Sequence, residues 1–274
     1  MHNPIALVLL LILSILATNS SFAKEGSNKK TASSDAKLPS AKTAEQAWHE
    51  LVGSTPRKQG VFKYVQRDPA LPNVLIYGDS ISIGYTQPVR EQLAGKANVF
   101  RLFRNGMESG RFIPLMQQMH NRMRNPQLVD PWSFDWDVIH FNVGLHDVKY
   151  WRNGQLDKKS GKQVTSVDDY AKNLEAIIAY LKQFAPDAKL IFATTTPVPK
   201  GANGRFAGDA VKYNKVALSV LKLHPEIAIN DLYSLCKPNQ EKWWSKPADV
   251  HYNGKARHKQ GAVVAKVIET ALAD

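Results

Sequence analysis

Short hydrophobic runs alternate with amphipathic stretches from residue 73 onward. Runs of the kind that form buried strands occur at 73–77, 98–103, 137–143, 189–194 and 226–230. Stretches with helical periodicity lie near 86–95, 111–124, 167–184, 207–223 and 255–272. Within 167–184, Tyr170, Leu174 and Ile178 recur at a spacing of four, which indicates an amphipathic helix. This alternation predicts a mostly parallel five-stranded sheet with helices on both faces, because parallel strands need crossover connections.

The part of the chain before residue 70 follows other patterns. Residues 5–17 form an uncharged apolar run that is shorter than the ~20 residues of a membrane-spanning helix. Small residues follow it at the spacing of a cleavage site, Ser21 and Ala23. We therefore predict a signal peptide over 1–23 and an exported protein, periplasmic or secreted, with an uncleaved anchor as the alternative. Residues 24–69 are interpreted as a linker and N-terminal extension that includes a short helix near 44–53, and residues 70–274 as one folded domain.

Charge and cysteine content narrow the function classes. The formal net charge is +12, and residues 1–23 contain no Lys, Arg, Asp or Glu, so cleavage would not change it. Such a balance favours anionic partners. The lysines are scattered and no nucleic-acid motif is present, so we expect ordinary solvated lysines and no nucleic-acid partner. Cys236 is the only cysteine, and the domain is therefore expected to fold without an internal disulfide.

Chemically reactive residues follow the predicted strands. Ligand sites in parallel sheets lie beyond the carboxyl ends of the strands. Ser80 comes just after the first run, the segments 105–110 and 144–147 follow the second and third, and Asp249 and His251 precede the last helix. A hydroxyl, an imidazole and a carboxylate are the groups that nucleophilic acyl transfer requires. Taken alone, however, a serine at a strand-to-helix junction is more often a helix cap.

Four short segments carry a family resemblance. The segments "IYGDSISIGYT", "NGMESG", "FNVGLHD" and "DVH" occur in the order of the four sequence blocks of the SGNH/GDSL hydrolase superfamily. The similarity spans about residues 72–272, and "ATTTPVPKG" and "INDLYSL" further resemble an exported bacterial branch. The resemblance implies a doubly wound, flavodoxin-like three-layer α/β/α fold for residues 70–274. It also implies a serine esterase that needs no cofactor and no metal.

The resemblance also assigns roles to residues. Ser80 would be the nucleophile, His251 the general base and Asp249 the carboxylate that orients it. The oxyanion hole would consist of the backbone N–H groups of Ser80 and Gly110 together with the side chain of His146. Gly110 lies five residues after an asparagine, as in the family pattern, and Gly106 is the alternative.

Two positions depart from the family pattern. His146 stands where the third block usually has an asparagine, although a neutral imidazole still carries one N–H donor. Ala248 occupies the usual position of the orienting aspartate, three residues before the histidine, and Asp249 lies only two residues before His251. The sequence therefore leaves open whether Asp249 completes a triad or Ser80 and His251 work as a dyad.

The substrate is predicted less specifically than the reaction. Five tryptophans lie near the third and last blocks, where they either stack on sugars or pack the core: Trp132, Trp136, Trp151, Trp243 and Trp244. With the export signal and the positive charge, they favour a carbohydrate O-acetylesterase that acts on a small-molecule or polysaccharide ester. The alternatives are a lipase, lysophospholipase or thioesterase of the same family, or a non-catalytic glycan-binding module. No integral membrane span is expected after signal cleavage.

Overall fold

A computed structural model describes residues 41–54 and 60–273. The predicted signal peptide and residues 24–40 and 55–59 of the predicted linker and N-terminal extension lie outside these residues. Five strands form the central sheet: β1 (Asn73–Tyr77), β2 (Asn98–Arg101), β3 (Val138–Phe141), β7 (Lys189–Ala193) and β8 (Ala228–Asn230). Their order is β2-β1-β3-β7-β8 and every pairing is parallel, which is the flavodoxin-like arrangement that was predicted.

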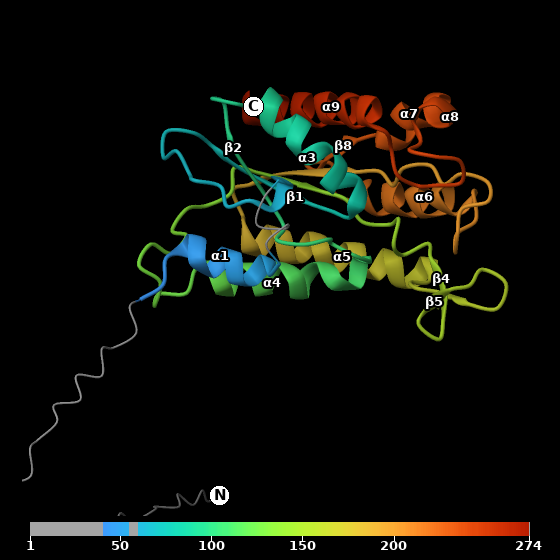
Figure 1. The fold of residues 1–274 in the computed structure, drawn as a ribbon, viewed down its shortest axis with the longest axis horizontal. Helices are drawn as coiled ribbons and strands as arrows, with labels where there is room; N and C mark the ends of the chain where they lie inside the picture. Colours follow the sequence, from blue (N-terminus) through green and yellow to red (C-terminus); the bar gives the residue numbers. More distant parts are fainter. Residues whose placement is uncertain (1–40, 55–59, 274) are drawn as a thin grey trace, which may run out of the picture. The chain divides into compact units, whose positions relative to one another are not determined.

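Helices cover both faces of this sheet (Figure 1). One layer contains α3 (Ser80–Gln92) and α9 (Gly254–Ala273), which pack against each other. The other contains α4 (Phe112–Met123) and α5 (Val167–Phe184), with α6 (Asp209–Leu221) beside α5. Along the sheet, the chain moves in one direction from β1 to β2 and in the opposite direction from β2 to β3. Because crossover connections are right-handed, α3 lies on one face of the sheet and α4 on the other. The predicted three-layer α/β/α fold is confirmed.

The first helix after β1 begins earlier than the hydrophobic pattern predicted. The pattern indicated a helix near 86–95, whereas α3 starts at Ser80. The side chain of Asp79 caps it by accepting the N–H of Ile81 at 2.8 Å. The Ile and Thr residues and the glycine of "SISIGYT" have low helix propensity, and this cap together with packing against α9 offsets it.

Helix α1 (Ala44–Val52) corresponds to the short helix expected near 44–53. Thr43 and Gln46 form a capping box at its start. Its apolar side, including Trp48, is buried in the main core, and the Trp48 ring lies 5.8 Å from that of Trp132. The boundary at residue 70 stays a prediction.

Several small elements were not predicted. A three-stranded antiparallel sheet lies between β3 and α5 and consists of β4 (Tyr150–Arg152), β5 (Gln155–Leu156) and β6 (Lys162–Gln163). The short helices η1 (Gly60–Phe62), η2 (Ser109–Arg111), α7 (Leu232–Cys236), η3 (Lys237–Asn239) and α8 (Gln240–Trp243) complete the described structure. Cys236 is buried with a free thiol. Among the described residues, no helix combines the length and the hydropathy that crossing a bilayer requires.

Candidate active site

Ser80, His251 and Asp249 form one line of hydrogen-bonding distances. The Nε2 atom of His251 lies 2.9 Å from Oγ of Ser80, and its Nδ1 atom lies 2.7 Å from Oδ1 of Asp249. A carboxylate only accepts, so Nδ1 carries the proton and Nε2 presents its lone pair to the serine hydroxyl. The fold thus brings together three residues that are up to 171 positions apart. We call these three residues the Ser–His–Asp unit.

Ser80 is free to face His251 because another residue caps the helix. Asp79 is the N-cap of α3, and Ser80 is its first helical residue. The backbone N–H of Ser80 therefore belongs to the first turn, whose amide groups have no partner within the helix. Gly78 makes this tight approach possible, since a Cβ there would come within 2.9 Å of the Ser82 side chain. The strand-to-helix turn thus leaves both the hydroxyl and the amide of Ser80 available.

Asp249 reaches the imidazole through a bent loop. Ala248 has φ of +60°, a left-handed conformation that turns the chain sharply just before Asp249. The Asp249 carboxylate also accepts the hydroxyl of Ser245 at 2.7 Å and the backbone N–H of His251 at 3.2 Å. Burial raises the pKa of Asp249, but these hydrogen bonds outweigh it and bring the pKa to about 2. The shortened spacing is therefore compatible with contact, and the carboxylate is ionised at neutral pH.

The two candidate glycines of the second block differ in what their backbones do. The N–H of Gly106 donates to the carbonyl of Gly78 at 2.9 Å, and its carbonyl accepts the hydroxyl of Tyr77 at 2.7 Å. A Cβ on Gly106 would lie 2.7 Å from the Tyr77 ring, so close packing explains this glycine. Gly110 instead lies in the first turn of η2, and a Cβ there would meet only Asn173 at 3.7 Å. The amide of Gly106 is occupied, which leaves Gly110 as the better donor.

Asp147 joins the second and third blocks. Its carboxylate accepts the hydroxyl of Ser109 at 2.5 Å and the backbone N–H of Ser109 at 2.9 Å. Asn173 donates to the same hydroxyl at 2.9 Å. These bonds fix the segment around Gly110 against the segment around His146.

His146 is buried and lies against a lysine. The Nζ atom of Lys149 is 2.8 Å from Nδ1 of His146 and 3.4 Å from its Nε2. Burial lowers the pKa of His146 to about 3, helped by the positive charges of Lys149, Arg205 and His251. The imidazole is therefore neutral at pH 7 and keeps one N–H donor. The pKa of Lys149 is also lowered, to about 8, mainly by burial and in addition by the positive charge of Arg205.

Arg205 is a site residue that the sequence analysis missed. It lies on the loop that follows β7, and its Nε donates to the carbonyl of Leu145 at 2.9 Å. Only 7% of its surface is exposed. Burial lowers the pKa of Arg205, and the negative charges of Asp79 and Asp249 partly offset this shift. No motif marks this arginine in the sequence, since it lies in an irregular segment far along the chain from the four blocks.

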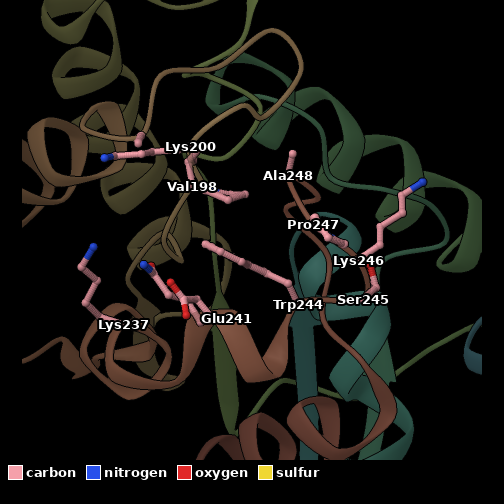
Figure 2. A pocket seen from close by; sticks show the side chains of 12 residues that line it. Val198, Lys200, Lys237, Glu241, Trp244, Ser245, Lys246, Pro247 and Ala248 are labelled. Atoms are coloured by element: carbon pink, nitrogen blue, oxygen red, sulfur yellow. The ribbon is translucent and has the colours of Figure 1, made fainter.

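A larger hollow adjoins the Ser–His–Asp unit. The crevice at Ser80 and His251 itself holds only about 10 Å³. A groove of about 690 Å³ is bounded by the loop after β7, by α8 and by the segment 245–248, which leads directly into Asp249. The side chain of Trp244 extends into it between Val198 and Glu241 (Figure 2). We call this hollow the Trp244 groove.

The five tryptophans differ in burial, and one of them, Trp243, is partly buried against the core. Trp132 and Trp136 are buried in a cluster of aromatic rings around Phe100 and serve the core. Trp151 is 45% exposed on β4, and Trp244 lines the groove. Across residues 41–54 and 60–273, no group of three or more His, Cys, Asp or Glu side chains is arranged to hold a metal ion.

The comparisons with known proteins bear on the family and on the fold. A sequence model of the GDSL-like Lipase/Acylhydrolase family matches residues 76–258, from β1 to the start of α9. No curated protein sequence matches the chain significantly.

Solved structures share the fold at low sequence identity. A lipase/acylhydrolase from Enterococcus faecalis has a TM-score of 0.56 and 17% identity, covering 73% of this chain and 96% of that one. An acetyl xylan esterase has a TM-score of 0.54 and 18% identity, with 72% and 99% covered. A carbohydrate esterase family 2 enzyme with a carbohydrate-binding domain from Corynascus thermopiles (Myceliophthora fergusii) has a TM-score of 0.50 and 19% identity, with 77% and 69% covered. These similarities support the fold.

Proposed function

The chain belongs to the GDSL-like lipase/acylhydrolase family and is an ester hydrolase, and from this premise we propose that it is a serine esterase that removes acetyl groups from carbohydrates. Ser80 is the nucleophile, His251 the general base and Asp249 the group that orients the base. The observation that supports this proposal most is the continuous line of short distances from Asp249 through His251 to Ser80.

The proposed reaction has two halves. In the first, Oγ of Ser80 attacks the ester carbonyl while Nε2 of His251 takes the hydroxyl proton. The tetrahedral intermediate collapses, the alcohol leaves with that proton, and an acetyl-Ser80 ester remains. In the second half, His251 removes a proton from water, which attacks the acetyl group and releases acetate. The ionised carboxylate of Asp249 stabilises the imidazolium formed in each half.

Three donors are proposed to hold the negative oxygen. The amide of Ser80 lies in the first turn of α3, and that of Gly110 lies in the first turn of η2. His146 supplies the third donor from its neutral ring. Preorganised donors of this kind act where charge develops, and losing one typically slows turnover about 100- to 1000-fold. His146 thus takes the role of the asparagine found in the family pattern.

Carbohydrate substrates are favoured over lipids by the surroundings of the site. The Trp244 groove combines an aromatic ring with polar and charged side chains. Of the three solved structures described above, two are named as an acetyl xylan esterase and a carbohydrate esterase, and one as a lipase/acylhydrolase. Lipase, lysophospholipase and thioesterase activities remain the alternatives within the same chemistry.

A direct assay tests the proposal. Purified protein is expected to hydrolyse p-nitrophenyl acetate and to release acetate from acetylated polysaccharides. Ser80→Ala should reduce both rates by at least about 1000-fold. Ser219→Ala is a control, since this exposed serine of α6 donates to the carbonyl of Lys215 within its own helix. Equal rates for the wild type and Ser80→Ala would contradict the proposal, and glycan binding without turnover would favour a non-catalytic binding module.

We also propose that the protein is exported. The apolar run and the small-residue cleavage motif in residues 1–23 support this, although they lie outside the described residues. Expression in a Gram-negative host followed by N-terminal sequencing should give a mature chain that starts at Lys24. An intact Met1 on all of the protein would contradict cleavage.

A further inference from the structure

Two cations beside the Ser–His–Asp unit have no carboxylate partner among residues 41–54 and 60–273. Neither Lys149 nor Arg205 lies within 4.0 Å of a carboxylate among the described residues. Among the described residues, the one hydrogen bond that the side chain of Arg205 makes uses its Nε. Its two terminal nitrogens are therefore unused by the described protein. We call Lys149 and Arg205 the cationic pair.

The surroundings of Arg205 differ from those of the other deeply buried arginine. Arg101 is completely enclosed, with two guanidinium nitrogens that have neither a partner nor contact with solvent. Arg205 is more than nine-tenths buried, yet none of its nitrogens is sealed off in this way. Its two terminal nitrogens therefore keep some contact with solvent. A buried charge without a partner is costly, so such an arrangement indicates that an anion completes it in the working state.

The cationic pair lies at the reaction site. The negative charges of Asp79, next to the nucleophile, and of Asp249 act to raise the pKa of Arg205. Lys149 contacts His146 directly. The segments that carry the pair are tied together, since the backbone N–H of Tyr150 donates to the carbonyl of Gly204 at 2.8 Å. An anion bound by Arg205 would thus lie close to the ester that Ser80 attacks.

The surface on either side of Arg205 is aromatic and basic. Phe206 follows it and is 45% exposed, as is Trp151 on β4. The ammonium of Lys158 lies 5.7 Å from the centre of the Phe206 ring. Exposed rings of this kind offer apolar faces to sugars, while the lysine adds positive charge.

The Trp244 groove is likewise aromatic and basic. Its volume of about 690 Å³ falls in the range of ligand-binding pockets. Three lysines line it, Lys200, Lys237 and Lys246, against one acidic residue, Glu241 (Figure 2). None of these lysines forms an ion pair within the part of the chain that the structure describes. The loop that carries Arg205 also forms one wall of this groove.

We propose that the cationic pair is a subsite for a carboxylate of the substrate, and that the substrate is an acetylated polysaccharide built from uronic acids. This inference rests on the proposed esterase function and specifies its substrate. The planar guanidinium of Arg205 matches a carboxylate through two parallel N–H groups. The carboxylate supplies the missing partner of Arg205, and the lysines of the Trp244 groove contact further residues of the acidic chain.

The test compares an acidic and a neutral polymer. Acetate release is measured on acetylated polygalacturonate and on acetylated mannan, with p-nitrophenyl acetate as a small neutral reference. The wild type should have the higher kcat/KM on polygalacturonate. Arg205→Met should lower the ratio of acidic to neutral kcat/KM about 10- to 100-fold. Arg205→Lys keeps the positive charge but loses the two parallel N–H groups of the guanidinium, so an intermediate ratio of acidic to neutral kcat/KM is expected.

A matched control removes the effect of overall charge. Lys189→Met deletes one positive charge at the exposed start of β7, at the opposite edge of the sheet from the cationic pair, and should leave the ratio unchanged. Equal losses on all three substrates with Arg205→Met would overturn the proposal, because the arginine would then act on the oxyanion or on the fold. A preference for lysophospholipids over both polymers would overturn it as well.

A binding measurement separates this inference from the proposed function. In the Ser80→Ala background, affinity for acetylated galacturonate oligosaccharides is measured by calorimetry with and without Arg205→Met, and thermal melting confirms that each variant is folded. Weaker binding with Arg205→Met supports the subsite even if turnover is absent. Equal affinity in both proteins would overturn the subsite while leaving Ser80-dependent hydrolysis intact.

Discussion

The Ser–His–Asp unit and the cationic pair differ in whether their charged side chains have partners among the described residues. In the Ser–His–Asp unit each polar group has a partner, and Asp249 alone accepts the Ser245 hydroxyl, the His251 amide and the imidazole. In the cationic pair, neither side chain has a carboxylate within the described structure, although Arg205 is almost fully buried. Paired groups are preorganised to carry out chemistry, whereas unpaired charges that keep contact with solvent, unlike the enclosed Arg101, are arranged for a ligand. Substitutions on the two sides should therefore change different kinetic quantities.

The largest effect is expected at Asp249. Asp249→Asn keeps the size of the side chain but removes the charge that stabilises the imidazolium and fixes its tautomer. We expect kcat on p-nitrophenyl acetate to fall about 10⁴-fold, as for the same change in a serine protease triad. Asp187→Asn, an exposed aspartate after α5, is the control and should not change kcat. A loss of less than tenfold at Asp249 would indicate a Ser80–His251 dyad.

A smaller effect is expected at the third oxyanion donor. His146→Phe removes the N–H donor while keeping a ring of similar shape, and kcat should fall about 100- to 1000-fold. His146→Asn restores a donor and should recover most of the lost activity, with steady-state kinetics as the measurement. Unchanged kcat in His146→Phe would exclude this side chain from the oxyanion hole.

The cationic pair should give a pH dependence that the Ser–His–Asp unit does not. Burial lowers the pKa of Lys149 to about 8, with Arg205 acting in the same direction and Asp79, Glu108 and Asp147 opposing it. The lysine is therefore charged below pH 8 and loses its charge as the pH rises through that value. The ratio of acidic to neutral kcat/KM should fall above pH 8.

This pH profile has a direct control in Lys149→Met. Its ratio of acidic to neutral kcat/KM should be low at every pH and should lack the step near pH 8. A step of the same size in Lys149→Met would assign the titration to another group.

The smallest effect is expected in the loop before Asp249. Ala248 has φ of +60°, a conformation that costs a residue with a Cβ roughly 1 kcal/mol relative to glycine. Ala248→Gly should therefore raise the free energy of unfolding by up to about 1 kcal/mol, less the extra entropy of glycine in the unfolded chain. Urea unfolding measures this change. A clear loss of stability would show that the alanine methyl group contributes packing that outweighs the strain.

The sequence predicted the inner strands of the sheet well because they are buried on both faces. Strands β1 and β3 read as short apolar runs, and the first and third blocks come at their ends. Helix α5 was predicted at its observed bounds, since its apolar spacing is regular and Ser166 caps it. The start of α3 was missed because its cap, Asp79, is followed by residues of low helix propensity.

The sequence did not predict the parts of the site that depend on loop geometry. Whether Asp249 reaches His251 depends on the left-handed turn at Ala248, which alanine does not signal. The small β4–β6 sheet has strands of two or three residues, too short for a periodic pattern. Arg205 comes near His146 only through the path of the loop after β7. Such contacts arise from tertiary packing, and no local pattern in the sequence encodes them.

The central claim, that His251 activates Ser80 as the nucleophile, is tested most directly by covalent labelling. A fluorophosphonate reacts with an activated serine and leaves a stable adduct that peptide mass spectrometry locates. We predict one adduct, on the peptide that contains Ser80, with a labelling rate that falls at least about 1000-fold in His251→Asn. An adduct on another residue, or equal labelling rates in the wild type and His251→Asn, would contradict the account.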